Sequence, residues 1–245
     1  MSLVDSLEKQ GNFLFKYRGQ FPLVLFVIAL PFLYYGEVPL CSERKIWNYI
    51  ALSVCVFGFL IRFYTIGTTP KGTSGRNREK QIADSLNITG IYSVLRHPLY
   101  LGNYFIWIGV AIFTYNIYFI IILSFLFWIY YRRIIFAEER FLERKFGHEY
   151  IDWSIHLHSF IPSFNRYVKT SIPFSVKSIF RREYAGVLSS VIGFVFVEFF
   201  RELFKNKEIT DIPFYRNVLI CTIIVVLLIR TLKHYTLILT EKDRS

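Results

Sequence analysis

The 245-residue chain has few cysteines, prolines and glycines, and each shortage excludes a class of protein. Cys41, Cys55 and Cys221 are odd in number and far apart, which fits neither a zinc site nor a framework of disulfides. The 8 prolines and 13 glycines are too few for a collagen-like or low-complexity chain. The chain must therefore be ordered mainly by its apolar surface.

Familiar nucleotide and metal motifs are also missing. There is no Gly-x-Gly-x-x-Gly sequence for a Rossmann site, and residues 67–74 lack the lysine that a phosphate-binding P-loop needs directly after its second glycine. His148, Asp152 and His156 are spaced to share a helix face and could bind a metal. A solvated helix with polar side chains explains that spacing better, so we predict no metal.

Apolar and aromatic residues are abundant instead. The apolar set makes up 53% of the chain, with 26 Phe and 17 Tyr. A soluble domain does not need so many aromatic residues, whereas lipid-facing surfaces and membrane interfaces favour them. We therefore predict an all-α integral membrane protein.

The distribution of charge predicts the topology. No Lys, Arg, Asp or Glu occurs from Pro98 to Tyr131, a stretch of 34 residues. One helix of that length would reach about 50 Å across a hydrocarbon layer of about 30 Å, so we expect a tight hairpin over 98–131 that turns at 114–116. The second helix should continue to Phe146, before Gly147. In total, about six transmembrane helices are expected, over 21–35, 46–67, 98–113, 116–131, 185–197 and 217–229.

The net charge of +11 is better explained by membrane topology than by nucleic acid. With six spans, 23 of the 29 Lys and Arg fall on the side that holds both termini. The positive-inside rule then places both termini in the cytoplasm, and we expect a multi-pass protein of a bacterial inner membrane. No nucleic-acid or protein partner is predicted.

Three regions are expected along the chain. Residues 1–45 hold an N-terminal span with its flanks, and residues 46–162 form the core. Residues 163–245 hold an interfacial segment and two weaker spans. The aromatic and basic stretch 159–183 fits a segment on the membrane surface or a loop packed on the domain. The last two runs are short enough to be interfacial or re-entrant.

The first candidate for chemistry is the sequence from Gly90 to Asn103. Pro98 disfavours helical geometry at His97 and is itself favoured in a first helical turn. Arg96 and His97 would then lie at the open N-terminus of a span, where free N–H groups attract anions. Gly102 would allow a ligand or another backbone to come close. An Arg-His pair that touches lipid phosphates is the simpler alternative.

The second candidate is the pair Glu138 and Glu139, in the helix that follows the hairpin. At helical spacing both fall on apolar stripes, where an unpaired carboxylate is costly. A cationic partner is therefore expected, either a cationic ligand or one of Arg96, Arg132 and Arg133. Simple solvation of these charges is the alternative.

Together the two blocks resemble the membrane methyltransferase superfamily, which includes isoprenylcysteine carboxyl methyltransferase and the phospholipid N-methyltransferases. The resemblance is specific over about residues 90–162 and does not cover the first span or the last sixty-odd residues. It rests on Gly90-x-Tyr92-x-x-x-Arg96-His97-Pro98-x-Tyr100-x-Gly102, then the hairpin, then Glu138-Glu139-x-x-Leu142 and Phe146-Gly147-x-x-Tyr150.

This resemblance implies S-adenosylmethionine as the methyl donor, in a cytoplasmic pocket without a Rossmann domain. It implies a cofactor-binding set that consists of Tyr92, His97, Tyr100, Leu101, Gly102, Glu138 and Glu139. Arg96 and Glu139 are the candidate catalytic residues, which orient or neutralise the acceptor.

The expected acceptor is an anionic membrane lipid, because cationic residues surround the site. A lipid phosphate of the lipid A type or a prenylcysteine carboxylate would fit, with Arg76, Arg132 and Arg133 as substrate-binding candidates. Three alternatives stay open: a phospholipid amine N-methyltransferase, a non-catalytic membrane scaffold, and an NADPH-dependent membrane reductase.

Overall fold

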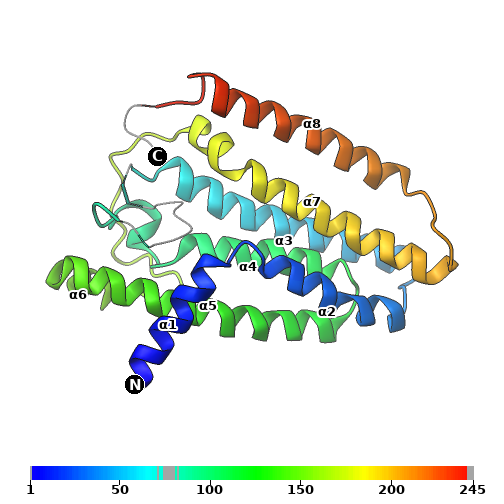
Figure 1. Cartoon of the computed structure of the whole chain (residues 1–245), viewed down its shortest axis with the longest axis horizontal. Coiled ribbons are helices and arrows are strands. Elements are labelled where there is room, and N and C mark those ends of the chain that lie inside the picture. The colour runs from blue at the N-terminus through cyan, green and yellow to red at the C-terminus, as the bar shows by residue number, and fades with distance from the viewer. Residues whose placement is uncertain (1, 71, 74–80, 82, 242–245) are drawn as a thin grey trace.

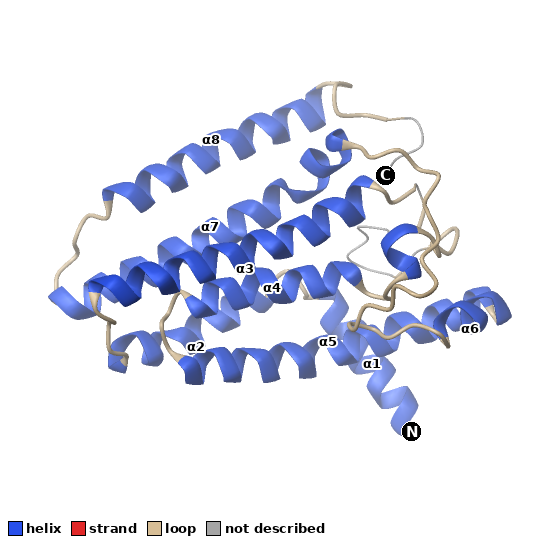
Figure 2. Ribbon diagram, turned by 180° about the vertical axis from the view of Figure 1, so that it is seen from behind, coloured by secondary structure: helices blue, strands red, loops and turns tan. Residues whose placement is uncertain are grey.

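The computed structural model describes residues 2–70, 72–73, 81 and 83–241, and this part of the chain is helical without strands (Figures 1 and 2). Its elements in order are α1 (Leu3–Lys16), α2 (Phe21–Tyr35), α3 (Cys41–Gly67), the 3₁₀ helix η1 (Gly90–Ser93), α4 (Pro98–Ile112), α5 (Ile117–Phe146), α6 (His148–Ser154), α7 (Val176–Asn206) and α8 (Pro213–Tyr235). The predicted all-α membrane fold is confirmed.

The central hairpin forms as predicted, with α4 and α5 joined by a short turn. Asn116 caps α5 by accepting hydrogen bonds from the backbone N–H groups of Tyr118 and Phe119. The turn residue Tyr115 has a φ of 61°. Helix α5 continues past the apolar stretch to Phe146 and stops at Gly147, whose φ of 55° suits glycine.

Helices α3 and α4 approach closely through glycines. A Cβ on Gly58 would lie 2.6 Å from the carbonyl oxygen of Gly102, and one on Gly109 would lie 2.7 Å from that of Ala51. Small residues are the usual way to bring two helix backbones together inside a membrane. This contact fixes the position of the hairpin against α3.

Fewer helices qualify as spans by length and composition than the six predicted. Among the described residues, α3, α5 and α8 are long and apolar enough to cross a membrane. Helices α1 and α2, bent by 86° to each other, would add a fourth if the pair is one span. Helix α4 has only 15 residues, and α7 carries buried charges such as Glu198 and Arg201. The number six therefore remains a prediction.

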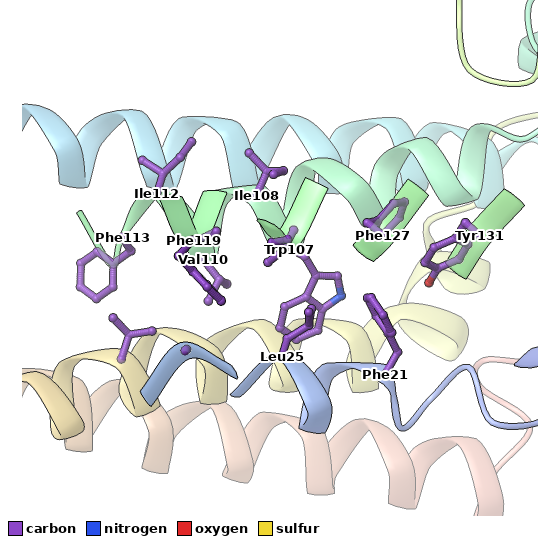
Figure 3. Close-up of a cluster of buried hydrophobic side chains, with 14 of the residues drawn as sticks. Phe21, Leu25, Trp107, Ile108, Val110, Ile112, Phe113, Phe119, Phe127 and Tyr131 are labelled. Atoms are coloured by element: carbon purple, nitrogen blue, oxygen red, sulfur yellow. The ribbon is translucent and has the colours of Figure 1, made fainter. Parts of the chain in front are cut away.

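The helices lie side by side, and the polar segments are found together at one end of the bundle (Figure 1). Helices α1 and α6, η1, and the start of α7 are found at this end in both views (Figures 1 and 2). Glu241 reaches the same end, because its carboxylate accepts hydrogen bonds from Ser175 and Ser178. Between the helices lies an aromatic core that includes Phe21, Trp107 and Phe127 (Figure 3).

Candidate functional site

The segment before α4, residues 94–97, is held in place by hydrogen bonds to the irregular segment 158–163. The backbone N–H groups of Arg96 and His97 donate to the carbonyls of His158 and Ser159, and that of Ser163 donates to Val94. These bonds satisfy backbone groups that would otherwise be exposed at the mouth of the site. The residues of the Arg-His-Pro block therefore have a fixed backbone.

Pro98 begins α4, as predicted, and places His97 at its N-terminus. The His97 side chain is buried, and its Nε2 lies 2.9 Å from Oε1 of Glu139 on α5. A guanidinium nitrogen of Arg96 lies 3.0 Å from the same oxygen. The expected cationic partner of Glu139 is therefore Arg96, with His97 beside it.

Glu138 occupies the neighbouring position, one residue earlier in α5. The Tyr100 hydroxyl donates to its Oε2 at 3.0 Å, and Nδ1 of His97 lies 3.7 Å from the same oxygen. The rings of His97 and Tyr100 stack with centroids 5.6 Å apart. The two sequence blocks thus meet across the hairpin in one polar cluster.

Beside this cluster lies a cavity of about 360 Å³, which is within the range of about 300–1,000 Å³ typical of small-molecule sites. Predicted site residues that line it are Tyr92, Arg96, His97, Tyr100 and Glu138. Further lining residues come from α1 and the turn after it, α3, residues 81, 83 and 85–87, α4, α5, α6 and α7, among them Phe15, Arg18, Arg62, Asn87, Asn103, Phe141, Tyr150, Trp153, Arg182 and Glu183.

Two buried polar atoms at this cavity point to a ligand. Nε of Arg96 and the Tyr150 hydroxyl have no hydrogen-bond partner within the described chain. Burial raises the pKa of Tyr150, although nearby Arg96 lowers it, so the phenol stays neutral and able to donate. Burial likewise raises the pKa of Tyr92 to about 12.

The chemistry of the lining suits the polar groups of S-adenosylmethionine. Glu138 can meet an ammonium group or ribose hydroxyls, and the N-terminus of α4 can meet a carboxylate, whereas Glu139 is not part of the lining. Phe141 and Trp153 offer aromatic surface on the same wall. No cluster suited to a metal ion occurs in the described ranges.

Several lining residues were not predicted from the sequence. Two of them form an ion pair, in which Arg62 donates through two nitrogens to both carboxylate oxygens of Glu183, at 2.7 and 2.6 Å. Arg62 also donates to Oδ1 of Asn103 at 2.6 Å. The sequence signal that could have indicated this ion pair is a single arginine inside an apolar run, because a charge in that position requires a partner.

Other predicted residues lie away from the cavity lining. Gly102 packs against α3, where an added Cβ would lie 2.5 Å from Cγ of Arg62. Leu101 lines two apolar grooves on the outside of the hairpin instead. Arg132 lies over the ring of Trp128, with its guanidinium carbon 5.0 Å from the ring centroid. Arg133 donates to Gln10 on α1, and Arg76 is outside the described residues.

Comparisons with known proteins identify a family whose matched segment overlaps this part of the chain. Residues 47–149 match the family described as phospholipid methyltransferase. Similar proteins include two named protein-S-isoprenylcysteine O-methyltransferase. One, from Tribolium castaneum, is 29% identical over 48% of this chain and 42% of its own length. The other, from Dictyostelium discoideum, is 27% identical over 64% of this chain and 67% of its own.

The match to the Tribolium castaneum protein thus covers less than half of that relative's length, and no solved structure matches the chain. The matched family segment nevertheless contains both polar blocks and the hairpin between them. Its family and both relatives are methyltransferases by name, as the resemblance implied. The comparisons therefore confirm the resemblance to the membrane methyltransferase superfamily over this segment.

Proposed function

We propose that this protein is a membrane-embedded methyltransferase that uses S-adenosylmethionine and methylates an anionic oxygen on a lipid-like acceptor. The observation that carries the proposal is the cluster of Arg96, His97, Tyr100, Glu138 and Glu139 beside a cavity of about 360 Å³. It lies inside the segment that matches the family.

The cofactor would be held by the wall that α4, α5 and α6 share. Glu138 and the Tyr150 hydroxyl are placed to bind its polar groups, and His97 orients both glutamates from the mouth of α4. When bound, S-adenosylmethionine supplies an electrophilic methyl group, which leaves the sulfonium sulfur as the acceptor oxygen forms its new C–O bond.

An anionic oxygen needs no proton removed before it attacks, so the protein has only to position it and exclude water. The names of the two relatives agree with an oxygen acceptor, since S-isoprenylcysteine carries its oxygens in its carboxyl group. Arg96, held by Glu139, would orient the acceptor at the cavity. Both polar blocks lie at the end of the bundle that holds α1 and Glu241, which we propose to be the cytoplasmic end (Figure 1).

Amine methylation is the main alternative. It needs a base, and both glutamates of the cluster are already engaged by Arg96, His97 or Tyr100. A reductase would need room for a nicotinamide cofactor. A non-catalytic scaffold would not explain why Nε of Arg96 and the Tyr150 hydroxyl lack a hydrogen-bond partner among the described residues at the cavity. The anionic acceptor therefore accounts for more of the site.

The test is methyl transfer by the purified full chain in phospholipid nanodiscs. Methyl-tritiated S-adenosylmethionine is supplied with one of three probes: N-acetyl-S-farnesylcysteine, dioleoyl phosphatidic acid or dioleoyl phosphatidylethanolamine. We expect label in an anionic probe, and none with the His97→Ala variant. Label in none of the three would overturn the proposal, and label in the amine probe alone would favour the amine alternative.

A further inference from the structure

A second hollow lies between α1 and α5, outside the proposed catalytic site. This groove has a volume of about 580 Å³ and an apolar lining that includes Phe13, Leu126, Ile129 and Tyr130. None of its lining residues lines the cavity beside the polar cluster. Helix α1, which forms one wall, also lies outside the segment that matches the family, since that match starts at residue 47. The methyltransferase function therefore leaves the groove unexplained.

Helix α1 is fixed against α5, so the groove has a defined shape. It lies across α5 and is turned by 86° from α2 (Figure 1). A Cβ on Gly11 would lie 2.6 Å from that of Ala137, which shows how closely the two helices approach. The Tyr130 hydroxyl donates to the carbonyl of Leu14 at 3.0 Å, and Nε of Arg133 donates to the side chain of Gln10 at the same distance.

The lining changes from apolar to cationic along α5. Leu126 and Ile129 belong to the uncharged stretch that ends at Tyr131, and Arg133 lies just beyond it. Ile129 is 46% exposed and Phe13, on the facing helix, is 63% exposed. A phospholipid has the same order, because its acyl chains lie in the hydrocarbon and its phosphate lies at the interface.

The charges at the groove have one sign. Within the described chain its charged lining residues are Lys9 and Arg133, and no Asp or Glu lines it. Lys16 follows Lys9 by two helical turns, and the rings of Phe13 and Tyr17 lie between and beside them with centroids 4.8 Å apart. Lysines interleaved with aromatic side chains are typical of a helix that lies on an anionic membrane surface.

We propose that this groove binds one anionic phospholipid of the surrounding bilayer, with an acyl chain on Leu126 and Ile129 and the phosphate at Lys9 and Arg133. A zwitterionic lipid carries the same phosphate but brings an ammonium group to the two cations, so it binds less tightly. The bound lipid is distinct from the methyl acceptor, because the groove and the cavity share no lining residue. The inference does not depend on the proposed methyltransferase function.

The test is native mass spectrometry of the purified full chain in detergent, titrated with dioleoyl phosphatidylglycerol or dioleoyl phosphatidylcholine and without S-adenosylmethionine. These probes differ in the head group alone. For the wild type we expect phosphatidylglycerol to bind roughly tenfold more tightly than phosphatidylcholine, and Lys9→Gln to weaken its binding about fivefold. Lys177→Gln removes the same charge from an exposed residue at the same end of the bundle, and it should bind like the wild type.

A second variant separates the groove from general surface charge. Ile129→Trp keeps every charge but fills the groove, and we expect it to weaken phosphatidylglycerol binding about tenfold. Ile122→Trp, two turns away on α5 and also exposed, is its control and should have no effect. Melting temperatures show that each variant is folded, and Arg133→Gln replaces Lys9→Gln if the latter does not fold.

Equal wild-type binding of the two lipids would overturn the inference, as would unchanged binding in the folded charge variant. Weaker binding in Lys9→Gln with unchanged binding in Ile129→Trp would also overturn it, because the lipid would then be held by surface charge alone. Weaker binding in both variants, with both controls like the wild type, would support it.

Discussion

Nε2 of His97 lies 2.9 Å from Oε1 of Glu139, across the hairpin formed by α4 and α5. The two residues are 42 positions apart in the sequence. Pro98 restricts the backbone at His97. The turn at Asn116 reverses the chain, so that α5 runs back along α4 and Glu139 lies beside His97. This contact ties the two sequence blocks into one site.

Loss of this contact should weaken cofactor binding. Glu139→Gln removes the charge that Arg96 and His97 share, and the loss of a charge-assisted hydrogen bond costs about 1.5–3 kcal/mol, or about tenfold or more in affinity. The measurement is the rise in melting temperature that S-adenosylhomocysteine causes in detergent. Glu143→Gln, one turn further on α5, is the control. An equal shift in wild type and Glu139→Gln would contradict the role of Glu139.

The Tyr150 hydroxyl should matter to a ligand and not to the fold. It is buried without a partner in the described structure, so Tyr150→Phe should leave the melting temperature of the ligand-free protein unchanged or raise it. The same change should weaken S-adenosylhomocysteine binding three- to tenfold. Tyr235→Phe, at an exposed position, should alter neither quantity. Lower stability with unaltered binding would show that this hydroxyl is structural.

The ion pair of Arg62 and Glu183 should be a main determinant of stability. Glu183→Ala leaves a buried guanidinium without its carboxylate, and such a loss costs about 3–5 kcal/mol. Asp211→Ala breaks the exposed pair with Arg216 and should cost less than about 1 kcal/mol. Thermal unfolding of the two variants in the same detergent compares them. Similar melting temperatures would mean that the buried pair contributes no more than the exposed one.

The glycine contact between α3 and α4 predicts a steric effect. In Gly58→Ala the new methyl group would meet the backbone of Gly102, and overpacking of this kind costs about 1–3 kcal/mol. We expect a melting temperature several degrees lower. Gly19→Ala adds the same methyl group where, among the described residues other than its chain neighbours, no atom lies within 4 Å, and it should be neutral. No difference between these variants would show that the two helices can separate freely.

The part of the fold that could be predicted from the sequence is the part with strong local signals. The hairpin followed from 34 uncharged residues, and the start of α4 followed from Pro98. The contact between the two candidate blocks followed from the expectation that Glu139 needs a cationic partner, and Arg96 provides that partner.

The rest depended on contacts that no local pattern encodes. Glu183 lies 121 residues from Arg62, and nothing in its own segment indicates which arginine it will meet. Arg132 and Arg133 are adjacent to the glutamates in sequence, but helical geometry turns them toward Trp128 and α1. The expected bacterial inner membrane also has no support, since the two similar proteins are eukaryotic.

The most direct test of the central claim is calorimetric titration of the purified full chain in detergent with S-adenosylhomocysteine, with NADPH titrated in parallel. We predict saturable micromolar binding of S-adenosylhomocysteine, its loss in His97→Ala, and no binding of NADPH. A folded wild-type protein that binds no S-adenosylhomocysteine would contradict the account.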